Sequence, residues 1–112
     1  MKIAFTSREP SWESQIDPRF GRTSYLAVYS DDTDEMSFYD NRDIENEAHG
    51  AGPKTAQKLF EYHPDILITG NGPGGNAASV LEKAGIDIYR AGDEMTVQEA
   101  YKAFKENKLS KI

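Results

Sequence analysis

The feature that most constrains this fold is a short apolar run, Ile-Leu-Ile at residues 66–68, which separates two segments with helical periodicity. A strand that is apolar on both faces is typical of the interior of a sheet that helices cover on both sides. Such a strand needs a parallel neighbour, and the right-handedness of strand–helix–strand crossovers leaves few positions for one. The chain is therefore predicted to fold as an α/β protein.

Five strands are predicted, and their order follows from the need to give residues 66–68 a parallel partner. In chain order, the strands cover residues 2–6, 25–29, 36–39, 66–68 and 86–89. The simplest arrangement puts the first strand in the centre, with the second antiparallel to it on one side and the fourth parallel to it on the other. Numbered along the chain, the strands then have the spatial order 3-2-1-4-5.

Three helices are predicted from apolar stripes and from signals at their ends. The first opens at Pro53, because proline suits the first turn of a helix. The second ends at Gly85, because glycine readily adopts the left-handed conformation that follows many helices. The third begins where Thr96 and Glu99 have the spacing of a capping box.

The apolar residues of these elements are expected to form the core, while the two long loops lack an apolar period. Loops 7–18 and 40–51 are expected to have no apolar anchors, to be the mobile part of the chain and to become ordered when a ligand binds. The predicted core comprises Ile3, Phe5, Leu26, Val28, Leu59, Phe60, Ile66, Ile68, Val80, Leu81, Val97 and Phe104.

Length and composition limit the class of protein. A chain of 112 residues is expected to form a single domain spanning 1–112. Its net charge of −6 argues against sequence-independent nucleic-acid binding, and the absence of cysteine excludes thiolate metal sites and cysteine nucleophiles. No apolar run approaches the roughly 20 residues of a membrane span, and the N-terminus lacks the apolar region of a signal peptide. A cytoplasmic protein without a membrane partner is expected.

The predicted topology brings three unusual segments to one edge of the sheet, at residues 17–22, 49–52 and 70–75. Ligands of open α/β sheets bind at such an edge, and two helix N-termini would offer N–H groups to an anion there. The segments predict an anion site. Its candidate binding residues are Arg19, Phe20, Gly21, Arg22, His49, Gly50, Ala51, Gly52, Asn71, Gly72, Gly74 and Gly75, and His49 is also a candidate metal ligand.

Each of these segments also has a structural interpretation. The glycines of 70–75 match the spacing of a dinucleotide fingerprint, yet they also suit a tight turn, and the lysine of a phosphate-binding Walker loop is absent. Arg19 and Arg22 are interpreted either as anion ligands or as solvated surface charges. His49 is interpreted either as a ligand or as a solvated loop residue.

In these segments the sequence resembles the dinitrogenase iron–molybdenum cofactor biosynthesis family, which includes NifX and the C-terminal domain of NifB. The resemblance covers nearly the whole chain. It implies a ribonuclease H-like three-layer fold with a five-stranded mixed sheet. It rests on residues 2–6, Asp17-Pro18-Arg19-Phe20-Gly21-Arg22, Asn41, residues 49–52, residues 70–76 and residues 84–89.

The resemblance implies a non-enzymatic binding or carrier domain for an anionic metal–sulfur cluster. The implied cargo is an iron–molybdenum–sulfur or molybdenum–copper–sulfur cluster, and the implied partner is a protein that donates or accepts it. This chain departs from the family at Arg19, because nitrogenase-associated members often have histidine before the Phe-Gly pair. It also departs from ribonuclease H-like nucleases, because the strand at 2–6 has no carboxylate for Mg²⁺.

Three functions therefore stay open at this stage. The first is a carrier for an anionic cluster or for an oxyanion such as molybdate or thiomolybdate. The alternative is a nucleotide- or phosphate-binding regulatory domain, and the third possibility is an interaction domain with a vestigial site. Enzymatic activity is not expected, because the candidate residues provide neither a nucleophile–base pair nor a pair of carboxylates.

Overall fold

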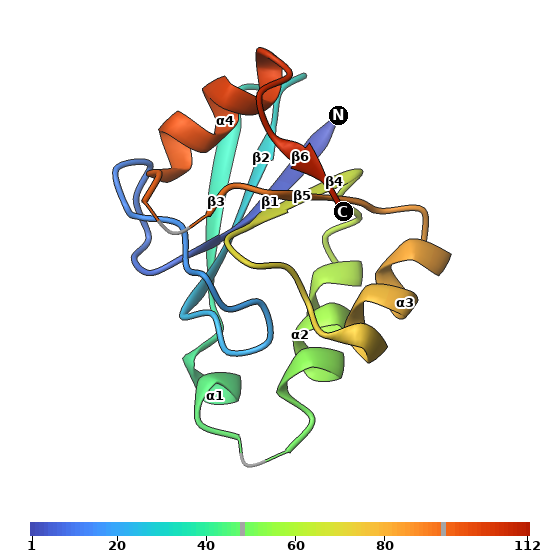
Figure 1. The fold of residues 1–112 in the computed structure, drawn as a ribbon. Coiled ribbons are helices and arrows are strands. Elements are labelled where there is room, and N and C mark those ends of the chain that lie inside the picture. Colours follow the sequence, from blue (N-terminus) through green and yellow to red (C-terminus); the bar gives the residue numbers. More distant parts are fainter. Residues whose placement is uncertain (48, 93) are drawn as a thin grey trace.

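The structure is a computed structural model that describes residues 1–47, 49–92 and 94–112. Within these residues, six strands form one mixed sheet in the order β3-β2-β1-β4-β5-β6, accompanied by four helices (Figure 1). None of the helices in this described part has the length and apolar character needed to cross a membrane. The elements are β1 (Lys2–Ser7), β2 (Tyr25–Ser30), β3 (Glu35–Asp40), α1 (Arg42–Glu45), α2 (Ala51–Phe60), β4 (Ile66–Thr69), α3 (Gly75–Lys83), β5 (Asp87–Arg90), α4 (Val97–Lys105) and β6 (Ser110–Lys111).

Strand β1 lies in the interior of the sheet, between β2 and β4. Its residue Phe5 lies opposite Ala27 of the antiparallel β2 and opposite Ile68 of the parallel β4. Beyond these neighbours, β3 pairs antiparallel with β2 and β5 pairs parallel with β4. The predicted order and directions of the first five strands are confirmed.

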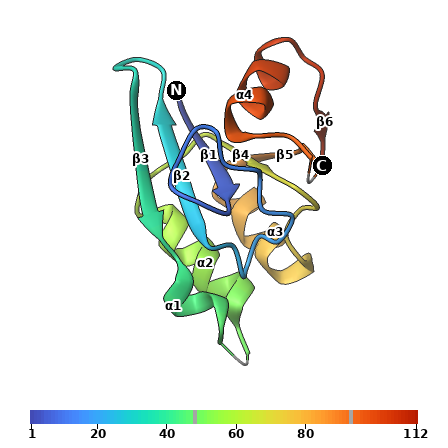
Figure 2. The ribbon, with the colours of Figure 1, turned by 90° about the vertical axis from the view of Figure 1, so that its left-hand side faces the viewer.

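Helices α2 and α3 cover one face of the sheet and α4 covers the other (Figures 1 and 2). Alternate side chains of a strand point to opposite faces. Leu67 of β4 therefore packs with α2 and α3, while its neighbours Ile66 and Ile68 pack on the α4 side. All four residues of β4 are buried, as expected for a strand enclosed on both faces.

The prediction of five strands and three helices is wrong in two places. Strand β6 pairs antiparallel with β5, with Tyr89 opposite Lys111. Its two residues are polar and exposed, so no apolar pattern marks them as a strand. Helix α1 contains four residues, which is too short to display a helical period.

Helix α2 begins two residues earlier than predicted, at Ala51 instead of Pro53. Proline still lies in the first turn, where backbone N–H groups have no acceptor within the helix. The missing N–H of Pro53 therefore costs no hydrogen bond. The other two end signals are confirmed. Gly85 has a φ of 80° after α3, and Thr96 and Glu99 form a reciprocal capping box.

Three residues of the predicted core lie differently. Val80 is 40% exposed, and Phe60 and Phe104 are only partly buried against the core. Ala77 and Leu81, one turn apart, define the buried side of α3. Val80 lies outside this stripe and is exposed, since α3 has a neighbouring helix, α2, on one side only. The predicted core residues that are buried are Ile3, Phe5, Leu26, Val28, Leu59, Ile66, Ile68, Leu81 and Val97.

The expectation that the two long loops lack apolar anchors is wrong. Ile16 is fully buried and Ile44 of α1 is 8% exposed. The backbone N–H of Ile16 donates to Met95 O (2.9 Å), so the loop at 7–18 is hydrogen-bonded to the segment that leads into α4. Residue 48 of the second loop lies outside the described residues.

Ser7→Ala is expected to leave the free energy of unfolding unchanged or to raise it by about 1 kcal/mol. Ser7 is fully buried, and its hydroxyl has no hydrogen-bond partner among the residues that the structure describes. The substitution removes a desolvated group that gains nothing on folding. Urea denaturation measures the difference.

The neighbouring variant Thr6→Val is the matched control. The Thr6 hydroxyl is equally buried, but it donates to Asp17 O (2.8 Å) and lies 2.9 Å from the hydroxyl of Thr69. Thr6→Val should lower the free energy of unfolding by about 1 kcal/mol or more. If Ser7→Ala destabilises the chain as much as Thr6→Val does, the Ser7 hydroxyl has a partner.

Candidate functional site

Two loops lie in contact where β1 and β4 end. Residues 17–24, called the Arg loop below, connect to β2, and residues 70–75, called the glycine loop, connect β4 to α3. The N–H of Asn71 donates to Pro18 O (3.1 Å). A Cβ added to Gly70 would lie 2.4 Å from Pro18 Cα, so this contact requires glycine at position 70.

The start of α2 completes the group. A Cβ on Gly21 of the Arg loop would lie 2.7 Å from Gly52 N, in the first turn of α2. A Cβ on Gly52 would in turn lie 3.5 Å from Ala77 Cβ, near the start of α3. The three segments predicted to converge are therefore in contact. The Arg loop, residues 49–52 and the glycine loop are called the rim below.

A fourth segment, residues 91–92, also joins the rim. The N–H of Gly92 donates to Gly70 O (3.1 Å), and that of Ala91 donates to Thr69 O (2.9 Å). This segment was not predicted, although β5 runs parallel to β4 and so must end at the same edge of the sheet. The Ala91-Gly92 pair, one residue after the expected strand at 86–89, was the available signal.

Both helices that start at the rim lack a capping side chain. In the described part of the chain, no side chain caps α2 or α3, and neither helix has an acidic residue in its first turn. The first intrahelical bonds run from Lys54 N to Gly50 O and from Ala78 N to Gly74 O. The N–H groups that precede these donors, with the positive ends of two helix dipoles, favour a negative charge at the rim.

The charges of the two rim arginines are placed differently from each other. Asp17 is only 1% exposed, and its carboxylate accepts hydrogen bonds from Arg19 N, Arg19 Nε and Arg19 Nη2, all at 3.0 Å. The positive charge of Arg19 is therefore balanced within its own loop. Arg22 donates through Nη1 to the backbone carbonyl of Glu47. This bond holds Arg22 against the segment between α1 and α2.

Asp17 is a residue that the sequence interpretation missed as part of the site. Besides the Arg19 bonds, it accepts from Ser24 N (3.2 Å), so it ties the two ends of the Arg loop together. The spacing of an aspartate two residues before an arginine was the available signal, because an Asp side chain often bonds backbone groups two residues further on.

The remaining predicted residues divide into anchors and exposed groups. Phe20 is 3% exposed and packs in the core beneath α2 and α3. Ala51 is also buried, whereas His49 and Asn71 are exposed. Gly72 has a φ of 90°, a conformation that glycine adopts without strain. No three His, Asp or Glu side chains of the described residues lie close enough together to hold a metal ion.

Gly74 and Gly75 are exposed and have no structural requirement for glycine. A Cβ at either position would meet no other described atom within 4 Å. Gly74 has a φ of −65° and a ψ of 168°, which any residue adopts. These two positions leave the backbone at the start of α3 open to close approach.

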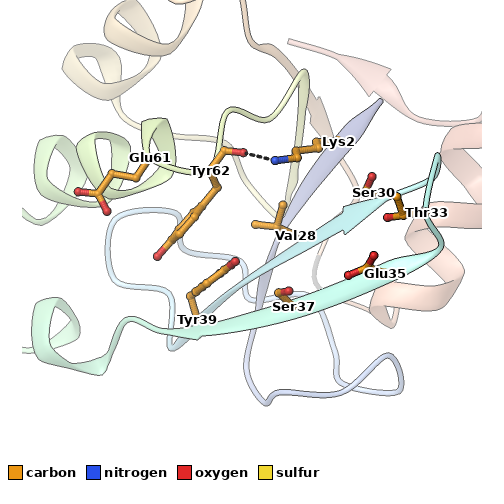
Figure 3. A pocket seen from close by; sticks show the side chains of 9 residues that line it. All are labelled: Lys2, Val28, Ser30, Thr33, Glu35, Ser37, Tyr39, Glu61 and Tyr62. Atoms are coloured by element: carbon orange, nitrogen blue, oxygen red, sulfur yellow. Dashed lines mark hydrogen bonds between the residues drawn. The ribbon is translucent and has the colours of Figure 1, made fainter.

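A cavity of about 410 Å³ lies at the opposite end of the sheet (Figure 3). Tyr39 and Tyr62 stack beside it with their ring centroids 3.8 Å apart, and Lys2 Nζ donates to Tyr62 O (3.3 Å). Burial raises the pKa of Tyr62, which keeps its phenol neutral. None of the predicted binding residues lines this cavity.

One pKa shift lies beside the rim, where β3 leads into α1. The Arg42 guanidinium bonds both carboxylate oxygens of Asp40, at 3.0 and 2.7 Å. These bonds hold the pKa of Asp40 at about 2. Asp40 is therefore ionised at neutral pH, with its carboxylate paired to Arg42.

Comparison with known proteins gives one family and several similar structures. The sequence matches the family described as dinitrogenase iron-molybdenum cofactor over residues 1–107. The apo form of the orange protein from Desulfovibrio gigas is 31% identical, with a TM-score of 0.92 and coverage of 99% of this chain and 92% of that one. A Thermotoga protein whose structure is described as that of a putative NifB protein is 34% identical, with a TM-score of 0.84 and coverage of 98% of this chain and 91% of that one. No curated protein sequence matches the chain.

Proposed function

Because the chain belongs to the dinitrogenase iron-molybdenum cofactor family, we propose that its rim carries an anionic metal–sulfur cluster, or an oxyanion such as molybdate or thiomolybdate. The cargo is an iron–molybdenum–sulfur or molybdenum–copper–sulfur cluster, delivered or accepted by a partner protein. The observation that carries the proposal is the pair of helix starts, α2 and α3, which lie side by side and which no side chain of the described residues caps. An anion placed between them meets N–H groups from both helices.

The open glycines of the rim support the same function. Gly75 occupies the first position of α3, where glycine lowers helix stability by up to about 1 kcal/mol relative to alanine. Neither backbone angles nor neighbouring atoms require glycine at Gly74 or Gly75. A ligand that lies directly on the backbone does require it, because a Cβ would hold the ligand away from the N–H groups.

The side chains of the rim suit capture of an anion better than catalysis. Arg22 supplies a guanidinium suited to anion recognition, within a chain whose net charge is −6. The buried Asp17 carboxylate is engaged by Arg19 and Ser24, so it is not available as a general base. We assign the fold to the ribonuclease H-like class without its nuclease chemistry, because β1 carries no acidic residue for Mg²⁺.

One observation favours the second candidate, a nucleotide- or phosphate-binding regulatory domain. The glycine loop lies directly between β4 and the start of α3, which is where a phosphate-binding loop of an α/β protein lies. The two candidates differ in their ligand and therefore in a simple uptake experiment.

The chain is expected to retain molybdenum after anaerobic incubation with tetrathiomolybdate, with Cu(I) or Fe(II) present, followed by desalting. Visible charge-transfer absorption that co-elutes with the protein, and metal analysis of the same fractions, measure the uptake. Lysozyme carried through the same steps is the control for non-specific retention.

Two results would contradict the carrier proposal. The first is a colourless, metal-free protein after desalting. The second is a rise in melting temperature with nucleotides or inorganic phosphate but none with tetrathiomolybdate, which would establish the second candidate.

A further inference from the structure

A fully buried hydroxyl connects the Arg loop to α2. Thr55, in the second turn of α2, donates its hydroxyl to Gly21 O (2.7 Å). The Thr55 hydroxyl oxygen in turn accepts a hydrogen bond from Asn41 Nδ2 (3.1 Å). Thr55 and Asn41 are both 0% exposed. A buried hydroxyl that both donates and accepts holds its partners at defined positions.

Asn41 holds the rest of the loop in the same way. Its Nδ2 also donates to Thr23 O (3.1 Å), and its backbone N–H donates to Ser24 O (2.9 Å). Its Oδ1 accepts from Lys58 Nζ (3.3 Å), one turn further along α2 than Thr55. The carbonyls of Gly21, Thr23 and Ser24 thus all accept hydrogen bonds from α2 or from Asn41, the residue after β3.

The connection determines the spacing between two elements of the rim. Gly21 lies so close to the first turn of α2 that an added Cβ would clash with Gly52 N at 2.7 Å. Arg22 extends from the Arg loop, whereas the N–H groups at Ala51 and Gly52 belong to α2. The affinity for a ligand held by both elements depends on their relative position, because a shift of about 1 Å moves the binding groups out of alignment.

We propose that Thr55, oriented by Asn41, is the positioning residue of the rim: its hydroxyl holds the Arg loop against the start of α2 without touching the ligand. The inference rests on the proposed function, since it concerns the same anion site. By analogy, partners that orient metal-ligating side chains typically change metal affinity by 10- to 100-fold when they are substituted.

The test compares Thr55→Val with Thr55→Ser in the full chain. Valine keeps the shape of threonine and removes the hydroxyl, whereas serine keeps the hydroxyl. Titration with tetrathiomolybdate, followed by absorbance well below the melting temperature, should give a Kd about tenfold higher for Thr55→Val and within about twofold of wild type for Thr55→Ser. If Thr55→Val does not fold, Thr55→Ala removes the same hydroxyl without adding a methyl group.

Thr69→Val is the structural control. Thr69 is also fully buried, and its hydroxyl contacts the Thr6 hydroxyl (2.9 Å), which bonds Asp17 O at the start of the Arg loop and none of residues 20–24. Thr69→Val should lower the free energy of unfolding and leave the Kd for tetrathiomolybdate nearly unchanged. Equal losses of affinity in Thr55→Val and Thr69→Val, or no recovery in Thr55→Ser, would overturn the positioning role.

Amide exchange of the ligand-free protein separates this inference from the proposed function. Thr55→Val should speed exchange at residues 20–24 more than Thr69→Val does. A wild-type chain that binds no tetrathiomolybdate would refute the carrier function and with it the effect on affinity, and exchange would then decide whether Thr55 holds the loop. Unchanged exchange at residues 20–24 would refute the positioning role.

Discussion

Gly70→Ala is expected to lower the free energy of unfolding by about 4 kcal/mol. The added Cβ would lie 2.4 Å from Pro18 Cα and 3.0 Å from Gly92 O, and both are backbone atoms that no side-chain rotation can move away. The strain comes from space alone, because the φ of Gly70 lies outside the left-handed region. To relieve it, the Arg loop must move and weaken the bond from Asn71 N to Pro18 O. Urea denaturation followed by Trp12 fluorescence measures the loss.

Gly75→Ala is the matched control for this prediction. It adds the same methyl group five residues further along the same loop, where a Cβ meets no described atom within 4 Å. Stability should stay unchanged or rise by up to about 1 kcal/mol, because alanine favours the helix. Trp12 is the single tryptophan of the chain and packs edge-on against Phe5, Tyr29 and Tyr101, so its emission reports on the fold. A loss of less than 1 kcal/mol in Gly70→Ala would show that the contact of Pro18 with Gly70 is looser than described.

Arg22→Ala is expected to raise the Kd for tetrathiomolybdate about 10- to 100-fold, which corresponds to the loss of one charge-assisted hydrogen bond. Arg19→Ala should have a smaller effect, because the buried Asp17 carboxylate already balances the Arg19 guanidinium. The sequence alone predicts similar losses for both arginines, and the pairing with Asp17 lowers the loss expected for Arg19. Titration followed by absorbance, at low and at moderate salt, measures both variants. Salt should weaken binding by the wild type more than binding by Arg22→Ala, because fewer site charges remain to be screened.

Lys83→Ala controls for the change in net charge. It removes one positive charge at the C-terminal end of α3, while the rim lies at the N-terminal end of the same helix. Its Kd should stay within about twofold of wild type, since screening weakens charges about a Debye length away. If Arg22→Ala binds tetrathiomolybdate as tightly as Lys83→Ala does, Arg22 is not a ligand of the anion.

The convergence of the rim could be predicted because strand order determines which segments meet. An apolar strand at residues 66–68, between two helices, requires a parallel neighbour, and the simplest arrangement places the strand at residues 2–6 beside it. Once these two strands are paired, the loops that follow them must meet at one edge of the sheet. The close contacts of Pro18 with Gly70 and of Gly21 with Gly52 are the places where these loops meet.

The parts that could not be predicted depend on pairings between residues with no distinctive pattern of their own. Nothing in Ser110-Lys111 indicates a strand, and they form β6 because β5 offers them an open edge. Ile16 lies four residues after Trp12 in an otherwise polar loop, and it is buried because the loop folds back beside β1 and the segment before α4. Val80 had the spacing of a core residue, yet α3 has a helix neighbour on one side only.

By itself, the sequence determined the α/β class, the order of five strands, the helix end signals and the three segments of the rim. These follow from apolar periodicity and from the conformational preferences of glycine and proline, which are local properties of the chain. Only the tertiary structure decided that Asp17 balances the charge of Arg19 and which buried hydroxyls hold the Arg loop. The pairing of Asp17 with Arg19 and the chain from Asn41 through Thr55 to Gly21 depend on distances of about 3 Å, and only packing sets such distances.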